Sequence, residues 1–133
     1  MTGYLLDTNA LLWMGLDDSQ LRPAVREKLA SAPRYVSVIS AAEISIKASI
    51  GKLRLPPPFD TDFGAAMRIL LRRTAVDLLP LDLPVIDHLR TLPLHHRDPF
   101  DRVIIVQALA SGLTLATRDR AFFAYDGLEI LEV

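Results

Sequence analysis

The sequence predicts an α/β fold, a three-layer sandwich in which helices flank a mainly parallel central sheet. Three features of the chain support this prediction. Short apolar runs recur that are too tightly bounded for helices, helical segments of about 10–15 residues separate them, and glycine, proline and capping residues mark the junctions. Strands joined through helices run parallel, because each crossover returns the chain to the same end of the sheet.

Length and composition describe one globular domain, which we expect to span residues 1–133. Half of the residues are hydrophobic and 23% are charged, which argues against a disordered chain. Cysteine is absent, so disulfides and cysteine-bound zinc are excluded, and a metal ion has to be held by oxygen or histidine. No apolar stretch approaches the roughly 18 residues of a membrane span, and no signal peptide is evident. We therefore expect a cytoplasmic protein without a membrane partner.

Five short segments are predicted to be strands because they are apolar or β-branched and are bounded by turn residues. The first ends at Asp7, and the fourth runs into a turn at residues 118–120. The predicted strands lie at residues 3–6, 35–39, 76–81, 113–117 and 128–133.

The predicted helices are defined by their caps and by apolar positions spaced to bury one face. Thr8 and Asn9 can cap the first helix, Pro33 stops the second, and Gly51 closes the third. The predicted helices lie at residues 10–15, 22–31, 40–50, 60–73, 84–92 and 99–112, and a brief one follows residue 120.

The helix at 99–112 is the most apolar, and the rest of the chain is expected to pack around it. Asp98 is placed to cap it, Pro99 occupies the first helical position, and Gly112 ends it. Asp101 falls in the first turn. Because this helix has almost no polar face, it should be buried on most sides.

Four carboxylates are predicted to meet at one edge of the sheet. Asp7, Glu43 and Asp119 each follow a predicted strand, and Asp101 begins the apolar helix. The active crevice of such sheets lies beyond the carboxyl ends of the strands. Clustered carboxylates repel each other or require a cation, and an all-oxygen site suits Mg²⁺ or Mn²⁺. Such an ion activates water for attack on a phosphodiester.

Each acid also has an ordinary structural interpretation. Glu43 completes a capping box with Ser40, or pairs with Lys47 one turn later. Asp98 fits a helix cap best, and Asp101 complements the helix dipole. Asp7 and Asp119 fit turns when considered singly. The metal site is favoured because four independent caps rarely meet at one sheet edge.

Several neighbouring residues have open assignments. Thr8 and Thr117 either cap helices or donate to a carboxylate or a substrate phosphate, and Arg102 is a third candidate for substrate binding. The loop pair His95 and His96 is interpreted as a surface or capping feature.

Four motifs together resemble the PIN-domain ribonucleases, and most closely the VapC-type toxins of prokaryotic toxin–antitoxin pairs. The most specific is His-Arg-Asp-Pro-Phe-Asp-Arg at residues 96–102. The others are Leu-Leu-Asp-Thr-Asn-Ala-Leu-Leu-Trp at 5–13, the segment from Val-Ser at 36–37 through Glu43 and Lys47 to Gly-Lys-Leu at 51–53, and Ala-Thr-Arg-Asp at 116–119.

The resemblance implies a PIN-like fold and a Mg²⁺- or Mn²⁺-dependent endoribonuclease, often a homodimer, that a small cognate antitoxin neutralises. By position, the catalytic and metal-binding acids are Asp7 and Asp101, then Glu43, with Asp119 as the most variable member. Asn9 departs from the histidine that related sequences often carry, and we expect little effect on metal binding. The alternatives are a housekeeping RNA- or DNA-processing nuclease, a catalytically silent PIN interaction module, and a phosphoacceptor switch domain modified on Asp7.

Overall fold

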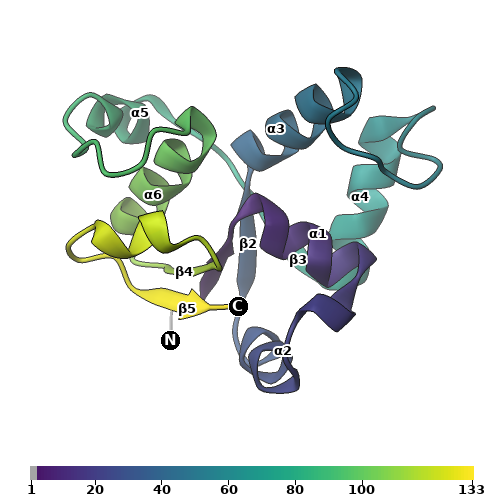
Figure 1. The fold of residues 1–133 in the computed structure, drawn as a ribbon, viewed down its shortest axis with the longest axis horizontal. Coiled ribbons are helices and arrows are strands. Elements are labelled where there is room, and N and C mark those ends of the chain that lie inside the picture. The colour runs from purple at the N-terminus through teal and green to yellow at the C-terminus, as the bar shows by residue number, and fades with distance from the viewer. Residues whose placement is uncertain (1–2) are drawn as a thin grey trace.

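The computed structural model of the protein describes residues 3–133 and contains a five-stranded parallel sheet flanked by helices (Figure 1). The sheet order is β3-β2-β1-β4-β5, and every neighbouring pair of strands is parallel. The predicted fold class is therefore confirmed, while residues 1 and 2 of the expected domain lie outside the described residues. The strands are β1 (Tyr4–Leu6), β2 (Arg34–Ser37), β3 (Val76–Leu79), β4 (Thr114–Thr117) and β5 (Ile130–Glu132).

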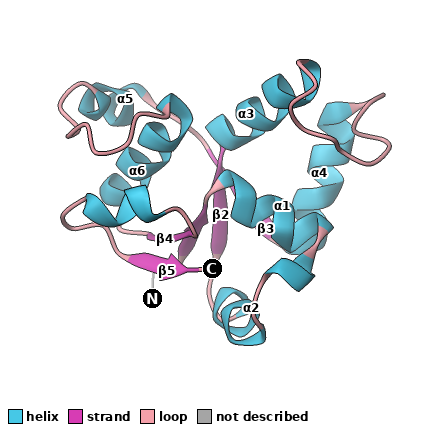
Figure 2. Cartoon of the chain, in the orientation of Figure 1, coloured by secondary structure: helices cyan, strands magenta, loops and turns pink. Residues whose placement is uncertain are grey.

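Helices cover both faces of this sheet (Figure 2). Two short 3₁₀ helices, η1 (Asp18–Gln20) and η2 (Arg120–Ala124), lie in the connections. No helix within residues 3–133 is long and apolar enough to cross a membrane. The α-helices are α1 (Thr8–Leu16), α2 (Pro23–Ala30), α3 (Val38–Ser49), α4 (Phe63–Thr74), α5 (Leu83–Leu89) and α6 (Pro99–Ser111).

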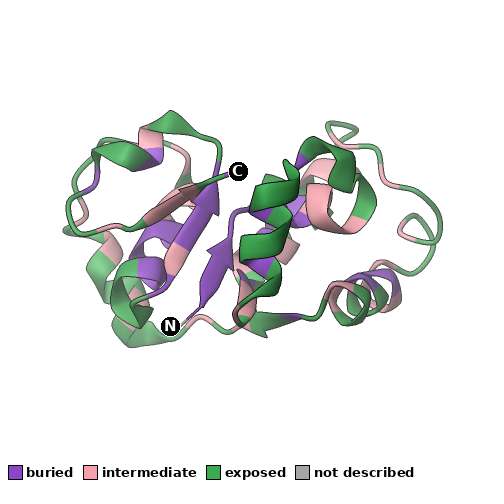
Figure 3. Ribbon diagram, turned by 90° about the horizontal axis from the view of Figure 1, so that it is seen from below, coloured by how far each residue is buried: buried purple, intermediate pink, exposed green. Residues whose placement is uncertain are grey.

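The central strand β1 is buried on both faces and divides the core in two (Figure 3). Tyr4 and Leu6 pack with apolar residues of α1, α2 and α4, whereas Leu5 packs on the opposite side with α6 and η2. This division follows from the alternation of side chains along a strand. A continuous apolar run is therefore required at β1, as the sequence shows.

The direction of sheet growth reverses between β1 and β4, which are adjacent in space but far apart in sequence. Leu6 pairs with Ala116, and the backbone N–H of Asp7 donates to the Ala116 carbonyl at 3.0 Å. The two strands thus end side by side. Parallel α/β sheets form their ligand crevice at such a reversal, beyond the carboxyl ends of the strands.

Helix α6 has the caps that the sequence predicts. The Asp98 side chain accepts a hydrogen bond from the Phe100 N–H, Pro99 is the first helical residue, and Gly112 adopts a left-handed conformation at the end (φ +66°). The helix is buried along most of its length. Its only buried amide, Gln107, donates to the Pro80 carbonyl at 3.2 Å, just beyond β3.

The predicted start of α3 is wrong. Strand β2 ends at Ser37, whose hydroxyl accepts from the Ile39 N–H, so that α3 begins at Val38. The run at 35–39 is apolar and β-branched and therefore resembles a longer strand, but the serine cap interrupts it. Ser40 and Glu43 consequently lie inside the helix, which overturns the capping box and the placement of Glu43 directly after a strand.

Other boundaries shift for similar reasons. Asp7, rather than Thr8 or Asn9, caps α1 by accepting from the Ala10 N–H at 2.8 Å. Helix α4 begins after Asp62 instead of at residue 60, because the Asp62 side chain accepts from the Ala65 N–H. Helix α5 ends three residues before the predicted position 92.

Candidate metal centre

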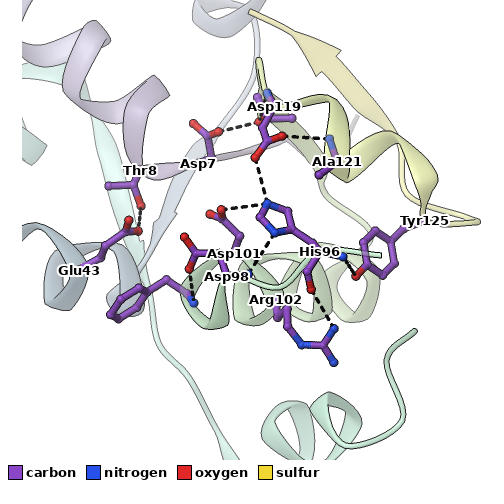
Figure 4. Close-up of polar contacts among 12 residues, drawn as sticks. Asp7, Thr8, Glu43, His96, Asp98, Asp101, Arg102, Asp119, Ala121 and Tyr125 are labelled. Carbon is purple, nitrogen blue, oxygen red and sulfur yellow. Dashed lines mark hydrogen bonds and ion pairs between the residues drawn. The ribbon is translucent and has the colours of Figure 1, made fainter. Parts of the chain in front are cut away.

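Asp7 lies at the junction of β1 and α1, at the carboxyl edge of the sheet where the strand order reverses (Figure 4). Only 6% of the residue is exposed. One carboxylate oxygen accepts from the Ala10 N–H, and the other accepts from the Thr117 hydroxyl at 2.6 Å. The helix cap and the strand end therefore fix this carboxylate in one orientation.

Thr117 connects Asp7 with Asp119. Its hydroxyl, fully buried at the end of β4, donates to Asp7 and accepts from the Asp119 N–H at 3.0 Å. Asp119 in turn caps η2 by accepting from the Ala121 N–H at 2.9 Å. One hydroxyl thus positions two of the four predicted acids.

His96 connects Asp119 with Asp101. Its Nε2 atom lies 2.9 Å from Asp119 Oδ2 and 3.1 Å from Asp101 Oδ2. One ligand atom from each of the three residues lies within 4.8 Å of the others. The imidazole is largely buried, with 11% of its side chain exposed, and its ring packs edge-on against Phe122. The interpretation of His96 as a surface residue is therefore wrong, although its ring also accepts from the Asp98 N–H, as a capping role requires.

Glu43 lies on α3, and its charge acts on Asp7 and Asp101. Its Oε1 accepts from the Thr8 hydroxyl at 2.7 Å, and its Oε2 lies 2.6 Å from Lys47 Nζ. The Thr8 hydroxyl also lies 3.0 Å from that of Ser40. The pairing with Lys47 that the sequence allowed is confirmed, and Glu43 is nevertheless buried and contributes to the raised pKa values of Asp7 and Asp101.

Arg102 is not brought to the acids. Its guanidinium donates to four backbone carbonyls of the loop that precedes α6. Figure 4 shows the guanidinium on the side of His96 that faces away from the four acids. Asp98, which precedes the helix, serves as its cap. The accepting carbonyls belong to Leu89, Leu92, Pro93 and His96.

The clustered acids perturb each other. Burial raises the pKa of Asp7 from 3.8 to about 6, and the charges of Asp119 and Glu43 add to this rise. Burial and the neighbouring Asp98 charge raise the pKa of Asp101 to about 7, with smaller contributions from Glu43 and Asp7. Both carboxyl groups are thus harder to ionise than free aspartate, chiefly because they are buried and secondarily because of the neighbouring acids.

This arrangement fits a hard divalent cation. All four acids offer carboxylate oxygens, the donors that Mg²⁺ and Mn²⁺ prefer. No protein group among residues 3–133 donates a hydrogen bond to Asp101 Oδ1, so that oxygen has no competing protein donor. A cation would favour the ionised forms of Asp7 and Asp101, which burial and the neighbouring acids disfavour.

The sequence analysis missed His96 as a member of this cluster. The available signal was its position two residues before the Asp98 cap, in the loop that enters the carboxyl edge of the sheet. Its partner Asp119 is 23 residues away in sequence, so local pattern does not reveal the contact.

Comparison with known proteins identifies the family. A PIN domain profile matches residues 4–128. Solved structures of similar fold include DNA-bound VapBC from Salmonella typhimurium (19% identity over 98% of each chain, TM-score 0.71). FitAcB from Neisseria gonorrhoeae is 26% identical over 97% of this chain and 96% of that chain, with a TM-score of 0.64. A toxin–antitoxin complex from Klebsiella pneumoniae is 17% identical, covering 98% and 97%, with a TM-score of 0.60. No curated protein sequence matches the chain.

Proposed function

This chain belongs to the PIN domain family, and from that premise we propose that it is a Mg²⁺- or Mn²⁺-dependent endoribonuclease that acts as the toxin of a toxin–antitoxin pair. The observation that carries the proposal is the convergence of Asp7, Glu43, Asp101 and Asp119 on the carboxyl edge of β1 and β4. The four acids come from separate segments, and no single helix cap or turn accounts for their meeting.

Asp7 and Asp101 are proposed as the principal ligands, with Glu43 and Asp119 completing the negative site. A divalent cation held there supplies a Lewis acid that activates water and neutralises charge on the phosphodiester. The surrounding residues keep the carboxylates in place: Thr117 orients Asp7, and Thr8 orients Glu43. Of the roles that the sequence left open for the two threonines, donation to a carboxylate therefore explains them better than contact with substrate.

Lys47 pairs with one acid of this site, its Nζ atom lying 2.6 Å from Glu43 Oε2. It neutralises one oxygen of Glu43, which in turn raises the pKa of the Lys47 ammonium and keeps it charged. Lys47 therefore compensates Glu43 and leaves the carboxyl groups of Asp7, Asp101 and Asp119 without a lysine or arginine partner among the described residues. A divalent ion would favour the ionised form of these acids and balance their charge.

The proposed partners are RNA, a small antitoxin and a second copy of the chain. The antitoxin is supported by the similarity to the toxin–antitoxin complex from Klebsiella pneumoniae and to FitAcB. RNA and the homodimer rest on the family resemblance. The net charge of −1 favours local rather than global contacts with RNA.

The test is incubation of the purified protein with a mixture of structured RNAs in Mg²⁺, Mn²⁺ or EDTA. The proposal predicts cleavage that needs the metal and is lost in Asp101→Asn. The exposed acid Asp87 on α5 provides the control variant Asp87→Asn, which should cleave like the wild type. Cleavage that survives EDTA, or that Asp101→Asn retains, would overturn the proposal.

The toxin assignment is tested separately by induced expression in bacterial cells. Wild-type protein should arrest growth, and Asp101→Asn should not. Growth arrest of equal strength by both proteins would show that toxicity does not depend on the proposed nuclease site. Cleavage of RNA in vitro without growth arrest would instead favour a processing nuclease.

A further inference from the structure

His96 occupies a position between two acids that belong to different parts of the fold. Asp101 lies in the first turn of α6, and Asp119 follows β4. Their Oδ2 atoms share a single imidazole nitrogen, Nε2, at 3.1 and 2.9 Å (Figure 4). No other side chain among the described residues contacts both carboxylates.

The second nitrogen of the ring determines what His96 can donate. The Asp98 backbone N–H donates to His96 Nδ1 at 3.2 Å, so Nδ1 carries a lone pair. A neutral imidazole with an acceptor at Nδ1 carries its proton on Nε2. The Nε2–H group therefore points at the two carboxylates and offers them one shared donor.

Two further residues hold the backbone of His96. The Tyr125 hydroxyl accepts from the His96 N–H at 2.9 Å and donates to the Pro93 carbonyl at 2.7 Å. Arg102 donates to the His96 carbonyl at 3.2 Å and to Pro93 at 3.1 Å. The peptide groups on both sides of the His96 side chain are thus tied to η2 and α6, the elements that carry Asp119 and Asp101.

We propose that His96 is a positioning residue, whose Nε2–H holds Asp101 and Asp119 together in the arrangement that receives the divalent cation. The inference rests on the proposed function for the identity of the site. Without this donor, the Oδ2 atoms of Asp101 and Asp119 would lose the group that links them, and only the contact of Asp119 with the Ala121 N–H would remain. Hydrogen-bond partners of ligating groups commonly set metal affinity in this way.

The proposal also explains features of the loop that a purely structural histidine does not require. A ring packed only for stability needs its contact with Phe122, whereas this ring has both nitrogens engaged with the segments that bear the acids. Arg102 then has an indirect role: it fixes the loop that presents His96.

The test is titration with Mn²⁺ alone, measured by isothermal calorimetry in the absence of RNA. His96→Ala should bind Mn²⁺ about 10–100-fold more weakly than the wild type, the usual effect of removing an outer hydrogen-bond partner. His96→Gln should recover most of that affinity, because the glutamine amide places an N–H donor near the position of Nε2. His95→Ala is the matched control, since the exposed His95 ring packs on Tyr125 and contacts none of the acids.

A kinetic measurement separates positioning from simple loss of fold. At saturating Mn²⁺, the kcat of RNA cleavage should be lower for His96→Ala than for the wild type, with little change in KM.

Tyr125→Phe provides a second variant that leaves the imidazole intact. It should weaken Mn²⁺ binding by about two- to tenfold, the effect of one neutral hydrogen bond.

Two results would overturn the inference. Mn²⁺ affinity of His96→Ala within twofold of the wild type would show that the bridge does not shape the site. Equal damage in His96→Gln and His96→Ala would show that the Nε2–H donor is not the cause. A wild-type protein that binds Mn²⁺ but cleaves no RNA would contradict the proposed function instead, while the comparison of affinities would still decide the role of His96.

Discussion

Replacing Asp7 with asparagine is expected to stabilise the metal-free protein at neutral pH and to abolish RNA cleavage. Burial raises the pKa of this carboxyl from 3.8 to about 6. The folded chain therefore holds its proton more tightly than the unfolded chain does. The resulting stabilisation is fully present below pH 3.8 and is lost as the pH rises to about 6.

The magnitude follows from that difference. The interval between 3.8 and about 6 corresponds to about 3 kcal/mol of unfolding free energy, of which about 2 kcal/mol is lost between roughly pH 4.5 and 7.5. Asparagine keeps the oxygen that accepts from the Ala10 N–H. In the wild type the Thr117 hydroxyl donates to the other Asp7 oxygen, and asparagine would present an NH₂ group to that hydroxyl instead. Rearranging that hydrogen bond costs about 1 kcal/mol. The variant should therefore gain about 2 kcal/mol relative to the wild type over this pH range.

Urea unfolding in EDTA at about pH 4.5 and about pH 7.5 measures this effect. The difference in unfolding free energy between Asp7→Asn and the wild type should shift by about 2 kcal/mol in favour of the variant as the pH rises. Using the difference cancels the titration of groups that the two proteins share. An identical difference at both pH values would refute the assignment of a buried, destabilising charge to Asp7.

The remaining predictions concern the core and the supports of the site. Ile104→Ala, in the fully buried face of α6, should lower the free energy of unfolding by about 2–5 kcal/mol, measured in urea. Leu109→Ala, at a half-exposed position, should lower it by less, and equal losses would show that the orientation of α6 is wrong. Thr117→Val removes the hydroxyl between Asp7 and Asp119 and should weaken Mn²⁺ binding about 10–100-fold by calorimetry; unchanged affinity would show that the bridge is dispensable. In Arg102→Lys the ammonium group cannot donate to all four carbonyls, so the free energy of unfolding should fall by about 1–3 kcal/mol while KM for RNA stays unchanged. A raised KM with unchanged stability would show that Arg102 contacts substrate.

The parts of the structure that depend on local signals could be predicted from the sequence. Helix α6 is defined by Asp98, Pro99 and Gly112, which act within one or two residues of the helix ends. The placement of Asp7 after β1 required only a short apolar run and the geometry of parallel sheets. The meeting of Asp7 with Asp119 then follows from topology, because β1 and β4 are neighbours.

Features that depend on long-range contacts could not be predicted in this way. The apolar run at 35–39 fits either a strand or the first turn of a helix, and only the Ser37 side chain decides between them. His96 was missed because its role depends on Asp119, which reaches it only after the chain has passed through α6 and β4. Nothing in the local sequence shows that Arg102 has partners, although in the folded protein its terminal nitrogens donate to four backbone carbonyls.

The most direct test of the account is the rate of RNA cleavage as a function of Mn²⁺ concentration, for the wild type and Asp101→Asn. The account predicts no cleavage in EDTA, saturable activation of the wild type by Mn²⁺, and no activation of the variant over the same range. Cleavage by the wild type that is independent of Mn²⁺, or superimposable activation curves for the two proteins, would contradict the claim that these acids hold a catalytic cation.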